Sequence, residues 1–440
     1  MSSDQSAGAD DILRQIKDQD LRFLRLWFTD VSGQLKSFSV NSSELERAIE
    51  SGIPFDGSSI TGFNAVEESD MVAVPDLSTF ATIPWRPTDQ GVGRIICDVR
   101  TPEGRAYEGD PRHVLRRAIT RMHDMGFSDL LVAPELEYYL FAGSEGTEVL
   151  DQGGYFDLTT LDAGSDVRRG TVIALEQLGV EVATSHHESG PSQHEVAMRP
   201  ASALKAADDC MTARITVKEI AMEHGWHATF MPKPLAEANG SGMHTNLTLL
   251  RDGENALVDN AGSLTETGRA FVAGQLRHAR EMSSVFAQWV NSYKRLVPGF
   301  EAPVYVAWSK RNRSALLRVA GAEGNGTIEL RCPDPACNPY LAFAAMLQAG
   351  LEGIEQGYEL PEAMDRNLYH LGAGERRRLG VEPLPESLGD AIELTADSEL
   401  MLRTFGEHML DRFVELKRRE WREYRVQVTD WEHQRYLPVL

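Results

Sequence analysis

The sequence predicts an α+β protein with more than one domain. Beyond residue 110, runs typical of strands, such as DLLVAPELEYYLF (129–141) and HTNLTLL (244–250), alternate with runs typical of helices, such as 204–225 and 338–357. The chain has 440 residues, 42% of them hydrophobic, so it can bury a sizeable core. Pattern and length together favour two domains that combine helices and strands.

The first domain is predicted over residues 1–105. Three runs there have the composition of short strands joined by turns: FLRLWFTDVSG (23–33), VAVPDLSTFATIPW (72–85) and GRIICDVRTPEG (93–104). They indicate a small α/β or β-rich module.

The second domain, residues 106–440, is predicted to begin with a helix. Asp110 is placed to cap that helix and Pro111 occupies its first position, with apolar residues every three or four places beyond. Near the other end, the run from Ser398 to Arg425 has the pattern of one long amphipathic helix, and an apolar-tipped tail follows it.

Charge and cysteine content exclude several classes of protein. Acidic residues outnumber basic ones 66 to 44 without any Lys/Arg-rich run, which argues against a nucleic-acid or membrane partner and favours a metal ion or cationic ligand. The four cysteines are too scattered for a disulfide framework, and no signal-peptide or membrane-spanning pattern is present. We therefore expect a cytoplasmic protein.

Two glutamates in PELEYYLF form the first candidate site. Glu135 and Glu137 are two residues apart, so in a strand both carboxylates lie on one face. They could line a solvated sheet edge. Their apolar neighbours make a compensating cation the more attractive interpretation.

The run SHHESGPSQHE (185–195) concentrates further metal-ligand side chains: His186, His187, Glu188, His194 and Glu195. It could be a polar loop, and its spacing is not that of a helical HExxH zinc site. Because carboxylates dominate, a bound ion would be hard, such as Mg²⁺ or Mn²⁺.

Other candidate residues lie further along the chain. His244 follows small residues and could be structural, and Glu329 and Arg331 share a strand face and could form an internal ion pair. Arginines suited to carboxylate and phosphate recognition are concentrated in 292–318, and no GxxxxGK[ST] loop is present. Carboxylates and a histidine around hard cations, beside arginines, indicate ATP-dependent phosphoryl transfer onto an acid.

These residues stand in motifs that resemble the type I glutamine synthetases. The motifs, in the family's order, are FDGSSITGF, PELEYYLF, HHESGPSQHE, KPLAEANGSGMH, NSYKRLVPGFEAP, RNRSA, IELRCPDP with CNPYLAF, and NLYHL. The resemblance implies a β-grasp-like N-terminal domain and a catalytic domain with a curved antiparallel sheet flanked by helices. It also implies a homo-oligomer of two hexameric rings, with each active site between neighbouring subunits.

The resemblance also implies roles for individual residues. The metal ligands would be Glu137, Glu188 and Glu195 for one ion and Glu135, His244 and Glu329 for a second. Glutamate would be bound by Asn239, Gly240, Arg295 and Arg331, and the phosphates of ATP by Arg313, Arg318 and Asn246. Asp56 and Ser59 of the adjacent subunit would join Tyr155 and Glu188 at an ammonium pocket. Glu301 would lie on a flap, and Asp56, Glu301 and Arg313 are the implied catalytic residues.

The implied reaction is ATP-dependent ligation of ammonia to the γ-carboxylate of glutamate. A γ-glutamyl-amine ligase that uses a polyamine, monoamine or ethanolamine is an alternative, and a catalytically weak regulatory paralogue is another. Family members usually carry a histidine at Asn246 and an arginine at Thr327, so both departures fall near the ATP phosphates. Tyr369 matches a tyrosine that some members adenylylate, and we expect an unmodified surface residue here.

Overall fold

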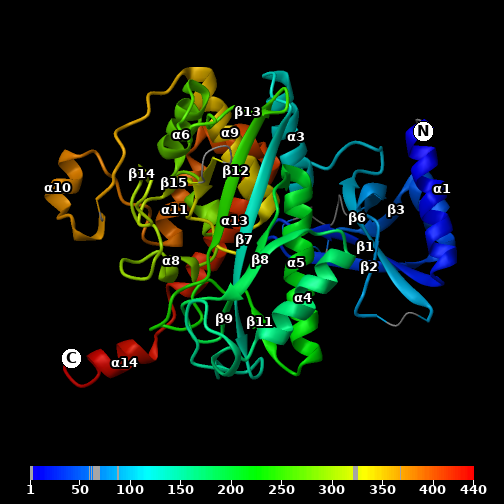
Figure 1. Ribbon diagram of the computed structural model, residues 1–440, viewed down its shortest axis with the longest axis horizontal. Helices are drawn as coiled ribbons and strands as arrows, with labels where there is room; N and C mark the ends of the chain where they lie inside the picture. The colour runs from blue at the N-terminus through cyan, green and yellow to red at the C-terminus, as the bar shows by residue number, and fades with distance from the viewer. Residues whose placement is uncertain are drawn as a thin grey trace.

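A computed structural model shows the α+β fold that the sequence predicts, with two sheets arranged along the long axis (Figure 1). It describes residues 3–58, 60, 62, 70–86, 89–320, 326–366 and 368–440. The smaller sheet lies at one end of the molecule, and the larger sheet runs through its middle.

The N-terminal sheet has the strand order β2-β1-β6-β4-β3, and β5 pairs with β6. Its strands and helices are α1 (Ser3–Asp18), β1 (Leu21–Thr29), β2 (Leu35–Asn41), α2 (Leu45–Ser51), β3 (Ile53–Asp56), β4 (Asp70–Pro75), β5 (Ala81–Thr82) and β6 (Gly91–Arg100). β1 and β6 are parallel and the other pairs antiparallel. Leu24 and Ile95 of this sheet are fully buried in one cluster with Ile12 and Ile16 of α1. The apolar face of α1 therefore holds this helix on the sheet.

The larger sheet has the order β14-β15-β16-β12-β7-β9-β8, with β10 and β11 on β7 and β13 on β12. Its strands are β7 (Asp129–Phe141), β8 (Val182–His187), β9 (Gln193–Met198), β10 (Ala201–Ser202), β11 (His227–Thr229), β12 (Met243–Arg251), β13 (Glu254–Asn255), β14 (Trp308–Ser309), β15 (Leu317–Ala320) and β16 (Thr327–Leu330). Every pair is antiparallel except β14 with β15, so the sheet is mixed but mostly antiparallel.

The helices of this part begin where the sequence supplies caps. They are α3 (Pro111–Asp124), α4 (Ser165–Gln177), α5 (Ala203–Glu223), α6 (Glu266–His278), α7 (Ser283–Phe286), α8 (Ser292–Arg295), α9 (Pro339–Gln356), α10 (Ala373–Arg378), α11 (Leu388–Ala396), α12 (Glu399–Phe405), α13 (Glu407–Tyr424) and α14 (Asp430–Tyr436). Asp110 accepts a hydrogen bond from the Arg112 amide at 2.9 Å and Pro111 opens α3, which confirms the predicted cap. α9 is almost wholly buried and packs against α3 and α6, so it lies at the centre of the core.

The prediction of one long helix from Ser398 to Arg425 is wrong. Gly406 has a φ of 76° and separates α12 from α13. Glycine adopts this left-handed conformation without the steric penalty of a Cβ atom, so the amphipathic pattern continues across a break in the backbone. Beyond α13, α14 extends away from the body of the molecule (Figure 1), with Trp431 and Leu437 61% and 76% exposed.

A buried arginine, Arg112, links the N-terminal sheet to helices of the larger domain. The Arg112 guanidinium of α3 lies 2.7 Å from Asp76 and 2.5 Å from Asp98 beside the N-terminal sheet, and 2.9 Å from Asp208 of α5. Three carboxylates around one guanidinium fix how the domains are oriented. The boundary that we place after residue 105 falls in the connection between β6 and α3. In the part of the chain described, no helix is both long and apolar enough to cross a bilayer.

Candidate active site

Strand register brings the predicted metal ligands together from distant parts of the sequence. Glu135 of β7 pairs with His244 of β12, and Glu137 of β7 pairs with Glu195 of β9. Glu329 of β16 pairs with position 246 of β12. Four adjacent strands therefore present these side chains to one region of the sheet.

The ligand atoms form two clusters in which all members lie within 4.8 Å of one another. In the first, His244 Nδ1 lies 3.3 Å from Glu135 Oε2 and 3.8 Å from Glu329 Oε1, so it contains the three residues implied for one ion. In the second, His186 Nε2 lies 2.8 Å from Glu188 Oε1, and its Nδ1 lies 4.0 Å from Glu195 Oε1. This cluster therefore groups His186 with Glu188 and Glu195, and Glu137 is not among its members.

Glu137 lies in the same cavity but is held by hydrogen bonds. Its Oε2 accepts from the Gly242 amide at 2.9 Å and from Gln193 Nε2 at 3.0 Å. Gln193 also donates to the Gly240 carbonyl at 3.2 Å. The sequence did not lead us to predict that Gln193 holds Glu137 in place. The available indication was its position beside His194 and Glu195 in an unusually polar run.

Burial without a cation shifts the pKa values of these groups. Desolvation, then the neighbouring carboxylates Glu137 and Glu135, raises the pKa of Glu195 to about 10. Desolvation and Glu188 raise that of Glu137 to about 8. Burial lowers the pKa of His244 well below its usual value, so the imidazole is neutral and can donate a lone pair to a metal.

Glu329 behaves differently because cationic groups surround it. Burial alone would raise its pKa, but the guanidinium groups of Arg331 and Arg318 outweigh that effect and lower it. Arg331 Nη1 lies 2.8 Å from Glu329 Oε1, and Arg318 pairs with Oε2. The internal ion pair suggested for Glu329 and Arg331 is therefore present, within the cluster.

A cavity of about 410 Å³ brings most of the predicted substrate residues together. Besides the clusters, its lining includes Tyr155, Asn239, Gly240, Arg295, Glu301, Arg313, Arg318 and Arg331. A Cβ on Gly240 would lie 2.5 Å from the Pro232 carbonyl and 2.7 Å from Arg295 Cγ, so only glycine allows this close approach. Arg295 donates to the carbonyls of Cys332 (2.7 Å) and Arg331 (3.0 Å), which orient its guanidinium.

Two side chains at the mouth of the cavity are distinctive. Tyr155 is 51% exposed, stacks on Phe156 with ring centroids 4.0 Å apart, and meets the edge of His186. Glu301 has a φ of 56°, a conformation uncommon for residues with a Cβ. Tyr369, expected on the surface, is half-buried and donates to the Ala302 carbonyl beside Glu301 at 2.5 Å.

The remaining predicted residues lie outside this lining. Asp56 is exposed at the end of β3 in the N-terminal sheet, and Ser59 lies outside the described residues. Asn246 does not line the cavity but contacts a residue that does: its Nδ2 donates to Glu135 Oε1, and its Oδ1 accepts from Thr327 Oγ1, both at 3.0 Å.

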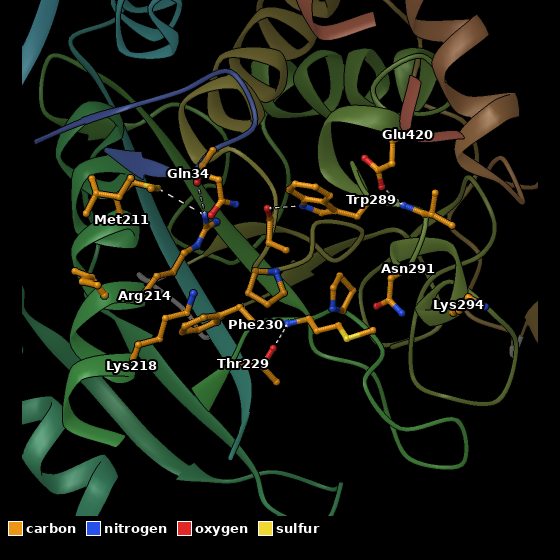
Figure 2. A pocket seen from close by; sticks show the side chains of 18 of the residues that line it. Gln34, Met211, Arg214, Lys218, Thr229, Phe230, Trp289, Asn291, Lys294 and Glu420 are labelled. Carbon is orange, nitrogen blue, oxygen red and sulfur yellow. Dashed lines mark hydrogen bonds between the residues drawn. The ribbon is translucent and has the colours of Figure 1, made fainter. Parts of the chain in front are cut away.

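A larger cavity, of about 830 Å³, lies on another part of the molecule and has a different lining (Figure 2). Aromatic and apolar side chains such as Phe230 and Trp289 dominate it. Among the residues described around it, Glu420 is the single carboxylate, and this side chain accepts from the Val290 amide and pairs with Lys417, both at 3.0 Å. It cannot supply a set of metal ligands, so we take the smaller cavity as the active site.

Comparisons with known proteins identify the family of this chain. Residues 20–102 match the β-grasp domain of glutamine synthetase and residues 108–436 its catalytic domain. Glutamine synthetases of Methanosarcina mazei and Thermotoga maritima are 48% and 45% identical, over 98% and 97% of this chain and 98% of each relative. A solved GmaS–ADP complex superposes with a TM-score of 0.88 at 30% identity, over 97% of this chain and 99% of that one.

Fold, site and comparisons together define a carbon–nitrogen ligase with an N-terminal β-grasp domain. More particularly, the chain belongs to the glutamine synthetase family.

Proposed function

We propose that the protein makes glutamine by ligating ammonia to the γ-carboxylate of glutamate at the expense of ATP, through γ-glutamyl phosphate. One observation carries the proposal: two clusters of metal-ligand side chains and four arginines line a single cavity. Identity of 45–48% to glutamine synthetases over nearly the whole chain supports it.

The carboxylate clusters fit divalent cations, Mg²⁺ or Mn²⁺, with two or more per site. Protons held on Glu137 and Glu195 offset buried negative charge that a cation would neutralise instead. We propose Glu135, His244 and Glu329 as ligands of one ion. For another ion we propose Glu188 and Glu195, which cluster with His186, together with Glu137 of the same cavity lining. Bound cations would neutralise charge on the transferring phosphoryl group.

The arginines and the close-approach loop would hold the two substrates. We assign glutamate to Arg295, Arg331, Asn239 and Gly240, and the phosphates of ATP to Arg313 and Arg318, with Asn246 behind them. Guanidinium groups suit both carboxylate and phosphate, and they balance the charge of two anionic substrates in one cavity. Phosphorylation turns the γ-carboxylate into an electrophile that an amine can attack.

The amine must be an uncharged nucleophile when it attacks. We propose that Asp56 of an adjacent subunit, with Ser59, joins Tyr155 and Glu188 to bind ammonium, and that the Asp56 carboxylate accepts its proton. Hydrogen bonds from Ser58, one from its amide at 2.8 Å, lower the pKa of Asp56, which keeps it ionised. Glu301 would lie on a flap that excludes water from the acyl phosphate.

A homo-oligomer of two hexameric rings would supply that second subunit. Asp56 lies on the N-terminal sheet of its own chain and does not line the described cavity, so the proposed site is incomplete in one chain. The exposed apolar side chains of α14 and the tail, and the apolar cavity of Figure 2, are surfaces suited to contact between subunits. Four buried free thiols support a cytoplasmic setting.

The test is phosphate release from ATP with glutamate and a panel of amines: ammonium, methylamine, ethanolamine and a polyamine. We expect turnover with ammonium at the highest kcat/KM. Turnover with a larger amine and none with ammonium would instead identify a γ-glutamyl-amine ligase. No turnover with any amine would identify a regulatory paralogue.

A further inference from the structure

A third group of potential ligand side chains does not line the described cavity and is not a metal site. Asp151, Asp162, His187 and His194 have ligand atoms within 4.8 Å of one another. The guanidinium of Arg168 already lies among them, 2.8 Å from both Asp162 Oδ1 and His194 Nδ1. A fixed positive charge at that place excludes a second cation.

Within this group, the Asp151 carboxylate ties together the ends of one loop. Its Oδ1 accepts from the Gly153 amide at 3.2 Å, and its Oδ2 accepts from the Ala163 amide at 2.9 Å. The segment between these amides contains Tyr155, which reaches the mouth of the cavity. One side chain thereby fixes both ends of the loop that presents Tyr155.

The same carboxylate also holds the turn between β8 and β9. Its Oδ1 accepts from the Ser192 amide at 2.8 Å and lies 3.1 Å from His187 Nε2. The other ring nitrogen of His187 lies 2.7 Å from the Glu188 carbonyl. Asp151 is thus two contacts away from the backbone of a proposed metal ligand.

Ser192 also accepts hydrogen bonds from the segment that carries Asp151, so the two residues are linked in both directions. Its hydroxyl accepts from the amides of Leu150 (2.7 Å) and Asp151 (3.0 Å), and its backbone has a φ of 57°. Such a conformation persists where surrounding contacts over-determine it. The next residue, Gln193, donates to Glu137 and to the Gly240 carbonyl, so the turn leads directly into the cavity wall.

We propose that Asp151 is a positioning residue that couples the Tyr155 loop to the turn carrying Glu188 and Glu195. This inference rests on the proposed function, because it assigns the loop to the amine and the turn to the metal. Asp151 does not line the described cavity and acts through the backbone on either side. Amine binding and metal binding therefore share one structural anchor.

Asp151→Asn is the informative change. Each carboxylate oxygen accepts from backbone amides, Oδ1 from Gly153 and Ser192 and Oδ2 from Ala163, so the NH₂ of asparagine must face a donor whichever way it is turned. Asp259→Asn is the matched control, since Asp259 also accepts two loop amides, from Ala261 and Ser263, in a loop without proposed ligands.

The experiment measures Mn²⁺ binding to the full chain without substrates, by electron paramagnetic resonance, together with the KM for ammonium. We expect Asp151→Asn to weaken Mn²⁺ binding roughly 10- to 100-fold and to raise the KM for ammonium, as is typical when a group that orients metal ligands is removed. Asp259→Asn should change neither. Unchanged Mn²⁺ affinity and unchanged KM, with only a lower melting temperature, would overturn the proposal.

Two further arms cover folding and the proposed function. If Asp151→Asn does not fold, Ser192→Ala replaces it, because this variant keeps Asp151 and removes the hydroxyl that accepts from the amides of Leu150 and Asp151. It should weaken Mn²⁺ binding and raise the KM for ammonium; no change in either would count against the coupling. If the wild-type protein does not use ammonium, the proposed function fails. The Mn²⁺ measurement would still test the coupling, with the KM taken for whichever amine is used.

Discussion

Replacing Glu137 by glutamine should stabilise the metal-free protein and weaken its stabilisation by metal. Desolvation and the nearby Glu188 raise the pKa of Glu137 from 4.5 to about 8. At pH 7.5 the folded protein therefore holds a proton that the unfolded chain has released. Across about three pH units this difference destabilises the folded state by up to about 4 kcal/mol.

Glutamine should remove that penalty and keep the local contacts. Glu137 Oε2 accepts from Gly242 and Gln193, and the amide oxygen of glutamine can accept from both. Two effects reduce this gain. The new NH₂ group needs a hydrogen-bond acceptor, and structural relaxation around the buried carboxyl already lowers the penalty in the wild-type protein. We therefore expect a net gain of about 1–3 kcal/mol in the metal-free protein, below the upper bound.

Urea unfolding at pH 7.5, with EDTA or with Mg²⁺, measures both effects. Wild-type protein at a Mg²⁺ concentration 100 times its dissociation constant should gain about 2.7 kcal/mol, and Glu137→Gln should gain far less. Glu254→Gln, at an exposed position of β13, serves as the control and should behave as wild type. A Glu137→Gln protein that is less stable without metal, or that keeps the full Mg²⁺ effect, would refute this reasoning.

Three further predictions concern other parts of the site. Asp56→Asn should lower kcat/KM for ammonium by about 10²-fold or more and leave activity with hydroxylamine, which is uncharged at neutral pH, unchanged. Asp70→Asn, at the cross-strand partner, should leave activity with both amines unchanged in the same assay. Because the pKa of Glu195 is raised to about 10, the folded state binds the extra proton, and the metal-free melting temperature should fall between about pH 6 and 9. In Glu195→Gln the metal-free melting temperature should depend less on pH over the same range. Thr327→Val removes the hydroxyl that holds Asn246 and should raise the KM for ATP about 3- to 12-fold; an unchanged KM would exclude a role for this hydrogen bond.

The predicted strands and the α+β class came from periodicity, which the structure confirms. The same periodicity placed Glu135 and Glu137 on one face of β7. It could not place His244 opposite Glu135, because register between strands a hundred residues apart depends on tertiary packing. The family motifs supplied that association before the structure did.

The directions of individual side chains and the break in one helix could not be predicted from the sequence. His186 and His187 are adjacent, and pleating sends one toward the cavity and the other toward Asp151, which composition alone does not reveal. The break at Gly406 had a signal in the glycine itself, but the amphipathic pattern continued through it. Asp56 is a separate case, since the residues that it would serve belong to another subunit under our proposal.

Asn246 and Thr327, the two positions at which we expect a departure from the family pattern, are joined by a hydrogen bond. Thr327 donates to the oxygen of Asn246, which leaves the amide NH₂ directed at Glu135, a proposed metal ligand. Without the Thr327 hydroxyl, the Asn246 amide could turn and present its oxygen to the carboxylate, which would repel it. The hydrogen bond from Thr327 therefore keeps a donor directed at Glu135, beside the complete cluster of Glu135, His244 and Glu329.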